Sequence, residues 1–270
     1  MTTRWKKVGI RTMTGLAVAT GPTIAACSSG PSYDEWAATD GAAGRINLDD
    51  VQTAFKDSKS VSDFEKRVNE IFEGDQIVLI RAEQTETALI LEGWEDLNGS
   101  NEIDDTQDDK LFTVTKQEDD TYQMRGYHAN SYYNSNFGAG NFLFTYMVLS
   151  SLSGPRYFYN TNPVQARTTV RGQRSSYRSS ATYERQVRTN SNYYSQQKNF
   201  AGSRYDAAGK NLSTSRQGYQ ANSRTSGSFK SSATGVRSSW GSVGRTGFSS
   251  GGFRGGGGGQ TIIGSIRDIG

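Results

Sequence analysis

The chain of 270 residues contains a single cysteine, Cys27, and a single histidine, His128, which limits the kinds of site that the chain can form. A single cysteine excludes an intramolecular disulfide. There is no glycine–serine elbow, and the glycine run near the C-terminus lacks the lysine of a phosphate-binding loop. Without a nucleophile, a base and a stabilising group in one pattern, the sequence favours a protein that is not an enzyme. A hydrolase that uses acidic residues stays as an alternative. It would be supported if an Asp104→Ala variant folded normally but lost turnover.

The chain also lacks an apolar run long enough to span a bilayer, which takes a helix of about 20 apolar residues. The run MTGLAVATGPTIAA is shorter than that. Four basic residues precede it, and the small residues Ala25 and Ala26 end it. This order of basic, apolar and small residues is typical of a secretory signal, which we expect over residues 1–26.

The sequence Ile24-Ala25-Ala26-Cys27 resembles the lipobox of bacterial lipoproteins. The resemblance implies that Cys27 is acylated and becomes the first residue of the mature chain. Each buried methylene contributes about 0.8 kcal/mol, so two or three acyl chains hold a protein stably on a membrane. We therefore expect a lipid-anchored protein of the bacterial cell envelope. Because Ser28 rather than aspartate follows the cysteine, the outer membrane or cell surface is favoured.

Acidic residues are nearly absent from the second half of the chain. Residues 151–270 hold 3 acidic and 17 basic residues, a net charge of +14, whereas residues 27–150 hold 24 acidic and 9 basic residues, a net charge of −15. Such asymmetry predicts a folded body and an interaction tail. The expected parts are a linker at 27–44, a small domain at 45–130, an aromatic and apolar segment at 131–163, and a basic tail at 164–270.

The body reads as an α+β fold. Asn47 predicts the N-cap of a first helix with aspartates in its first turn. A second helix is expected from near Ser62, which has capping-box spacing to Glu65, and Gly74 is placed to end it. Runs rich in Val, Ile and Leu at 76–82 and 87–94 predict one hairpin, and 110–116 and 121–127 predict another. The predicted fold is two N-terminal helices on a small antiparallel sheet of about four strands.

Six acidic residues crowd positions 96–109, between the two predicted hairpins. The segment DLNGSNEID places oxygen-bearing residues at the spacing of EF-hand and dockerin-type calcium loops, which it resembles. The resemblance implies a structural calcium ion with ligands at Asp96, Asn98, Ser100, Glu102 (through its carbonyl) and Asp104.

The acidic segment also departs from the calcium-loop pattern. Position six is Asn101 rather than glycine, although asparagine also adopts the left-handed conformation. Gln107 stands where the last carboxylate belongs, so Asp108 is expected to supply it. Strands flank the loop in place of helices, and Ile103 is expected to pin the loop to the core. The alternative is an ordinary turn rich in aspartate, asparagine and glycine.

From about residue 164 onward we find no apolar periodicity, which predicts disorder to near Gln260. Basic and aromatic residues interleave here and resemble the RGG-like segments that bind single-stranded nucleic acid. Export argues against nucleic acid and favours anionic polymers of the envelope as partners. The candidate anion-binding residues are Arg171, Arg174, Arg178, Arg185, Arg188 and Arg204.

Other interpretations of the second half stay open. The basic segment is either a solvated spacer or a tail that folds back on its own acidic body. The apolar run at 142–152 either covers the core or contacts a membrane. The terminal TIIGSIRDIG is a candidate docking strand.

Overall fold

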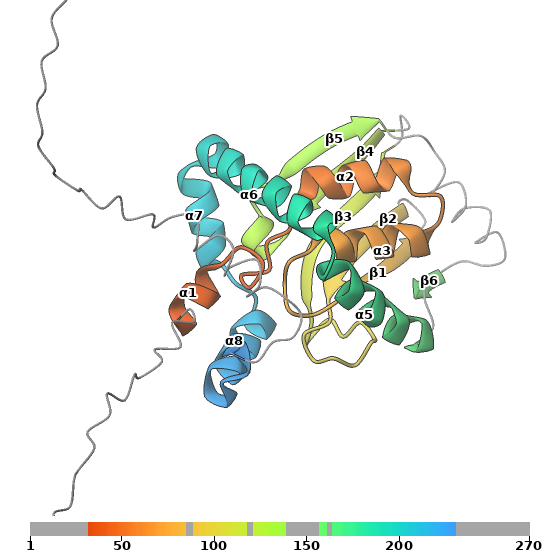
Figure 1. Cartoon of the computed structure of the whole chain (residues 1–270). Helices are drawn as coiled ribbons and strands as arrows, with labels where there is room; N and C mark the ends of the chain where they lie inside the picture. The colour runs from red at the N-terminus through yellow and green to blue at the C-terminus, as the bar shows by residue number, and fades with distance from the viewer. Residues whose placement is uncertain (1–31, 85–88, 118–120, 139–156, 161–163, 231–270) are drawn as a thin grey trace, which may run out of the picture. The chain divides into compact units, whose positions relative to one another are not determined.

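The computed structural model of the chain describes residues 32–84, 89–117, 121–138, 157–160 and 164–230 (Figure 1). They belong to one compact unit that combines helices with an antiparallel sheet, so the predicted α+β class is confirmed. The expected signal segment, Cys27, the apolar run 142–152 and the candidate terminal strand lie outside the described residues.

The sheet contains a meander of five strands and a sixth strand at one edge. The strands are β1 (Val78–Gln84), β2 (Leu89–Glu95), β3 (Asp109–Lys116), β4 (Thr121–Gly126), β5 (Asn134–Gly138) and β6 (Tyr157–Asn160). Their order is β5-β4-β3-β2-β1-β6, and all neighbours are antiparallel. Both predicted hairpins are confirmed. The expected number of four strands was too small, because β5 continues the meander and β6 pairs with β1.

Helices α2 (Leu48–Asp57) and α3 (Val61–Ile71) are the two helices predicted before the sheet. Asn47 caps α2, since its side chain accepts a hydrogen bond from the Asp50 amide. Ser60, not Ser62, caps α3. The expected partner Glu65 is buried and accepts a hydrogen bond from the Ile80 amide at 3.1 Å, so it joins α3 to β1. Helix α3 ends at Ile71, before the predicted Gly74.

The main core lies between these two helices and the sheet. Its fully buried members alternate along the strands and recur along the helices, as apolar faces of the two elements must. Aromatic rings fill its centre, with Phe55 and Phe64 edge to face at 5.9 Å between ring centroids. Tyr193 and Tyr194 of a later helix complete the core.

The expected linker at 27–44 is wrong for its described part. Helix α1 (Tyr33–Ala38) begins with a capping box formed by Ser32 and Glu35. Trp36 is buried and lies 5.9 Å, between ring centroids, from Phe229 near the other end of the described chain. An aromatic contact therefore ties this segment to the C-terminal helices.

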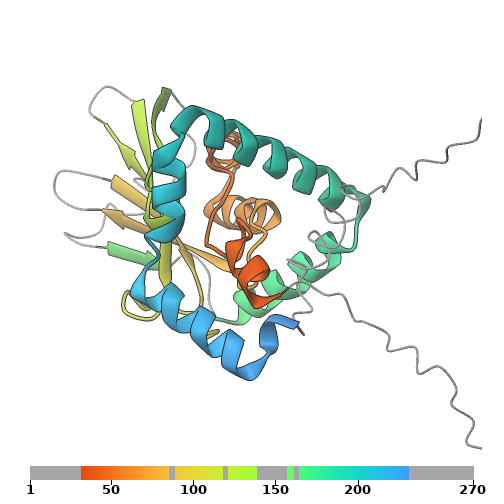
Figure 2. The same ribbon diagram turned by 90° about the vertical axis from the view of Figure 1, so that its left-hand side faces the viewer.

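The expected disorder is wrong for residues 164–230, which form four helices and a short 3-10 turn. The helices are α5 (Val164–Arg178), α6 (Ala181–Ala201), α7 (Ser203–Lys210) and α8 (Thr214–Ser226), followed by η2 (Ser228–Lys230); another 3-10 turn, η1 (His128–Asn130), precedes β5. Figure 2 shows α5 to α8 following one another around α1 and the earlier helices. Their buried faces are rich in arginine, tyrosine and amide side chains, with Val170 and Val187 as the larger aliphatic members, so they carry little aliphatic periodicity. Residues 231–260, the rest of the expected disorder, lie outside the described residues.

Candidate functional site

The acidic loop is the connection of residues 96–108 between β2 and β3, and hydrogen bonds from its own backbone fix its path. The Asn98 side-chain oxygen accepts from the Ser100 amide at 2.8 Å, and the Ser100 hydroxyl accepts from the Glu102 amide at 3.1 Å. Asp108 closes the loop by accepting from the amides of Leu97 at 3.0 Å and Asp104 at 2.8 Å. Each of these side chains thus binds backbone amides of the loop itself, with Asp108 buried and Asn98 and Ser100 exposed.

Three sequence predictions about this loop are confirmed. Asn101, at position six, has a φ of 62°, the left-handed conformation expected there. Ile103 packs against Ile77 and Leu79, so it does pin the loop to the core. Strands β2 and β3 flank the loop, as predicted. The backbone of the segment thus follows the expected course without an ion.

Asp96 is the central acid of the loop and is fully buried. Its Oδ2 accepts from the Asn101 amide at 3.0 Å, which turns the carboxylate toward the middle of the loop. The same Oδ2 contacts Nη2 of Arg171 on α5 at 2.7 Å. Its other oxygen, Oδ1, is buried and has no hydrogen-bond partner among the described residues. Half of this carboxylate is thus satisfied and half is not.

Asp108 and Asp104 differ in their surroundings and in their hydrogen-bond partners. Burial raises the pKa of Asp108 to about 6, with a further rise from the charge of Asp96, while amide hydrogen bonds lower it. Asp104 is directed to the following turn, where its oxygens accept from Thr106 and Gln107. Two carboxylates, Asp96 and Asp108, are therefore the charged groups of the loop interior.

Within the described part of the chain, no three His, Cys, Asp or Glu residues form a group that could hold a metal ion by themselves. A cation at this loop would depend on neutral oxygens as well as on Asp96 and Asp108. Calcium accepts such a set, because it takes six to eight carboxylate, amide, hydroxyl, carbonyl and water oxygens. The available neutral donors are the Asn98 and Ser100 side chains and the Glu102 carbonyl.

A stripe of arginines on α5 contacts this region from outside. Arg167, Arg171, Arg174 and Arg178 follow at intervals of four, three and four residues, which puts them on one helix face. Arg167 donates to the Asn101 carbonyl, and Arg171 donates Nε to the Asn101 side chain at 3.1 Å. The first half of the stripe therefore holds the acidic loop.

The second half of the stripe binds the end of α3. Arg174 donates to the Phe72 carbonyl at 3.1 Å and to the Gly74 carbonyl, and Arg178 donates to the same two carbonyls at 3.0 and 2.8 Å. Free carbonyls at a helix C-terminus carry partial negative charge and attract cations. Burial lowers the pKa of Arg174 and of Arg178.

Three of the six predicted anion-binding arginines are thus internal contacts: Arg171, Arg174 and Arg178. The expectation that they face an external polymer is wrong, because their guanidinium groups meet carboxylates and carbonyls of the same chain. The alternative that this segment folds back on the acidic body is confirmed for residues 164–230. Arg185, Arg188 and Arg204 are exposed.

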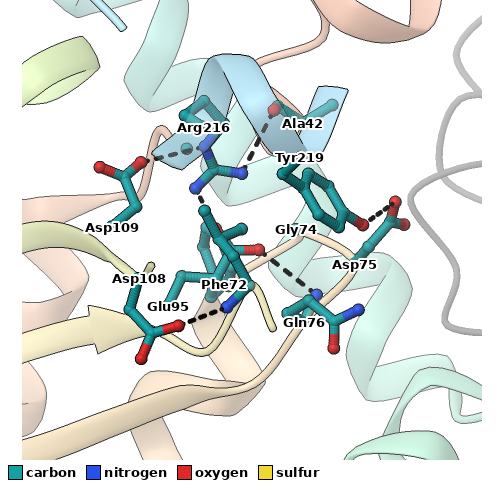
Figure 3. Close-up of polar contacts among 12 residues, drawn as sticks. Ala42, Phe72, Gly74, Asp75, Gln76, Glu95, Asp108, Asp109, Arg216 and Tyr219 are labelled. Carbon is teal, nitrogen blue, oxygen red and sulfur yellow. Dashed lines mark hydrogen bonds and ion pairs between the residues drawn. The ribbon is translucent and has the colours of Figure 1, made fainter. Parts of the chain in front are cut away.

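A second arginine contact lies beside the loop, and the sequence analysis missed it. Glu95 and Asp109 face each other across β2 and β3, and Arg216 of α8 enters between them (Figure 3). Its Nε lies 2.9 Å from Asp109 Oδ2, and its Nη2 contacts Glu95. All three side chains are at most 3% exposed. Burial raises the pKa of Glu95 to about 7, although Arg216 lowers it.

Two further polar features lie outside the acidic loop. A pocket of about 490 Å³ lies between the 38–45 segment, α6 and α7, with Arg45, Glu73 and Lys198 among its lining residues. His128 lies elsewhere, with Nε2 3.7 Å from Asp109 Oδ1. The histidine therefore belongs to the carboxylate pair beside the loop and not to the pocket.

No family model, curated protein or solved structure matches the chain. No helix within the described ranges is long and apolar enough to cross a membrane.

Proposed function

We propose that this chain is a non-enzymatic lipoprotein of the bacterial envelope whose folded unit binds one calcium ion in the acidic loop. The signal layout of residues 1–26 and the lipobox-like sequence at Cys27 support the anchor. An exported protein meets calcium at millimolar levels, which suits the affinities of about 10⁻⁴–10⁻³ M that extracellular calcium modules have.

The observation that carries the calcium proposal is the unsatisfied Oδ1 of Asp96. A buried charged oxygen without a partner is costly, so such an atom calls for a ligand. Because the Asn101 amide and Arg171 both bind Oδ2, the free oxygen is left for a cation in the loop. The proposed ligands are oxygens of Asp96, Asn98, Ser100, Glu102 and Asp108, with water.

Asp104, also expected as a ligand, has a lesser part in this proposal. Its carboxylate already accepts three hydrogen bonds from Thr106 and Gln107. Those bonds lower its pKa and keep it charged. It therefore adds negative potential near the ion, or binds through water as ninth-position residues often do.

Calcium titration with thermal melting tests the site. At a calcium concentration ten times the Kd, binding stabilises the folded state by about 1.4 kcal/mol. For a domain of this size that raises Tm by roughly 3–6 °C relative to chelator. Asp96→Asn and Asn98→Ala should reduce or abolish the shift. Asp105→Asn is the matched control, because Asp105 is an exposed acid of the same loop that pairs with Arg81.

Equal Tm values with calcium and with chelator in the wild type would remove the ion from the proposal. The anchor has a separate readout. Mass spectrometry of the native chain should find an acylated Cys27 at the N-terminus, and an intact Met1 would remove the envelope setting.

A second activity is proposed for the exposed basic residues of α6 and α7. Arg185, Arg188 and Arg204 are exposed, and none forms an ion pair with a carboxylate among the described residues. We propose that they bind anionic envelope polymers. Changing all three to glutamine should weaken binding to lipopolysaccharide and flatten its salt dependence, because fewer counterions are released.

The matched control for the polymer proposal carries the same charge change at the exposed Lys56 of α2, Lys66 of α3 and Lys59 of the turn between them. Equal loss of binding in both triple variants would mean that net charge alone, and not this surface, attracts the polymer. Salt-insensitive binding would overturn the electrostatic mechanism itself.

A further inference from the structure

The pocket between α6, α7 and the segment that follows α1 takes no part in the proposals above. Its volume of about 490 Å³ lies within the range of roughly 300–1,000 Å³ that small-molecule sites occupy. Of its thirteen lining residues, only Ala38, Gly41 and Val187 lack a polar side chain. An apolar ligand would leave the other polar groups without partners, so the pocket suits a polar ligand.

Asp40 lines this pocket and is held there by two donors. Its Oδ1 accepts hydrogen bonds from Arg45 Nη1 and from the Tyr205 hydroxyl, each at 2.7 Å. Arg45 is fixed in turn, because its Nη2 donates to the Tyr205 carbonyl at 2.8 Å and its guanidinium lies over the Tyr205 ring, 3.8 Å from the ring centroid. Asp40 Oδ2 has no hydrogen-bond partner among the residues that the structure describes, and the side chain is 28% exposed. One oxygen is thus oriented by the protein, and the other is available to a donor on a ligand.

Helix α6 lines the pocket with hydrogen-bond donors. Ser191, Ser195 and Lys198 follow at intervals of four and three residues, which puts them on one helix face. All three are exposed, and Lys198 forms no ion pair with a described carboxylate. The first turn of α7 adds Asp206, an exposed lining residue that also lies outside the described ion pairs. An ammonium group and a carboxylate therefore share one pocket without pairing with each other.

We propose that this pocket binds a small zwitterion, an amino acid or a peptide of two or three residues with free termini. The carboxylate of the ligand accepts from the Lys198 ammonium and from the α6 hydroxyls. Its ammonium group donates to Asp206 and to the open Oδ2 of Asp40. Both contacts are charge-assisted hydrogen bonds, which are stronger than neutral ones.

The mixed charge of the lining argues against ligands of one sign. A simple anion would face the three lining acids Asp40, Glu73 and Asp206, whereas a simple cation would face Lys198. A zwitterion places each of its charges against an opposite one. A neutral polyol also fills such hydrogen bonds, but its binding does not depend on charged ends, and the probes below separate the two classes.

The first test measures binding of alanine, dialanine and trialanine to the full chain by ligand-observed NMR titration. Each added residue lengthens the span between the two charged ends by up to about 3.3–3.6 Å. At least one of the three should bind with a Kd on the order of 1 mM or lower. The N-acetylated and the C-terminally amidated forms of the tightest binder each lack one charge and should bind about tenfold more weakly. Absence of binding by all three, or capped forms that bind as well as the uncapped one, overturns the inference.

The second test repeats the titrations with Lys198→Gln, Asp206→Asn and the control Lys210→Gln, which changes an exposed lysine of α7 outside the pocket. Lys198→Gln should bind the uncapped and the amidated forms equally and still discriminate against the N-acetylated form. Asp206→Asn should reduce the discrimination against the N-acetylated form and keep that against the amidated form. Lys210→Gln should match wild type.

Lys198 and Asp206 are both exposed, so their substitution leaves the fold intact and the two variants report on the charged ends of the probe. An equal loss for all three forms in either pocket variant overturns the role assigned to that charge. A loss in Lys210→Gln as large as that in Lys198→Gln means that net charge, and not the pocket, attracts the probe, and it also overturns the inference.

Discussion

Arg216 is the buried cation on which the folded unit depends most, and replacing it with methionine should destabilise the protein strongly. The side chain is 1% exposed and lies between Glu95 and Asp109, which face each other across two strands. Methionine fills much of the same space but carries no charge. The variant would leave two buried carboxyl groups opposed without a cation between them, so folding would require one of them to take up a proton or to stay charged and unpaired.

The size of the effect follows from the two contacts that are lost. Removing one partner of a buried ion pair typically costs about 3–5 kcal/mol, because the other partner stays buried and unpaired. The total free energy of unfolding of a natural domain is roughly 5–15 kcal/mol. Arg216→Met should therefore lower the urea midpoint by about 2 M, taking an m-value near 2 kcal/mol/M.

Urea unfolding in the presence of chelator measures the effect without a contribution from calcium. Arg185→Met is the control, since Arg185 is exposed and donates to the Thr182 hydroxyl, and it should stay within about 0.5 kcal/mol of wild type. A triple variant that adds Glu95→Gln and Asp109→Asn removes the opposed charges and should recover at least half of the loss. An Arg216→Met midpoint near wild type, or a triple variant no better than the single one, would refute this account.

Three other outcomes are expected. Gly44→Ala should cost more than Gly99→Ala in thermal melting: both glycines have positive φ, but a methyl group at Gly44 would lie 2.7 Å from Arg216 Nη2, whereas nothing lies within 4 Å at Gly99. Arg174→Met should cost about 1–3 kcal/mol in urea unfolding, because the carbonyls of Asp75 and Gln76 lose the Arg174 donor, whereas Arg178 still donates to those of Phe72 and Gly74. A cost equal to that of Arg185→Met would argue against the contact. Cys27→Ser should leave the urea midpoint unchanged and release the protein from the membrane fraction.

Apolar periodicity predicted the first half of the folded unit well. Val51 and Phe55 on α2, and Phe64 and Val68 on α3, are the buried positions that their spacing indicated. The strands were recognisable for the same reason. These elements bury aliphatic and aromatic side chains, so the apolar pattern of each local segment indicates which of its faces is buried.

Arginine and tyrosine periodicity was the signal that could have revealed the C-terminal helices. On α5 the buried face is a stripe of arginines, and on α6 it includes Tyr183, Val187, Asn190 and Tyr194 at helical spacing. A hydropathy scale treats arginine and asparagine as exposed. The α5 arginines bind partners 66 to 106 positions away, such as Asn101 and the Phe72 carbonyl, and no local segment contains that information.

In the acidic loop, too, the sequence predicted the local features but not the long-range contacts. Its backbone course, the left-handed Asn101 and the anchoring Ile103 were predicted, because turn chemistry is local. The pairing of Asp96 with Arg171 was not, since only the fold brings α5 to the loop. From the sequence, the crowded acids were explained either by a bound ion or by an ordinary turn, and pairing with an arginine was not considered.

Arginine and calcium are not exclusive answers to the crowding of acids at 96–109. The arginines approach from outside the loop: Arg81 pairs with Asp105 and Arg171 with Asp96. Asp108 has no cation partner among the described ion pairs, and the inner oxygen of Asp96 has no hydrogen bond. Cations of the chain thus neutralise Asp105 and one oxygen of Asp96, and buried Arg167 adds positive charge near Asp96. The calcium proposal therefore depends on Asp108 and on the second oxygen of Asp96, and not on the crowding of acids as such.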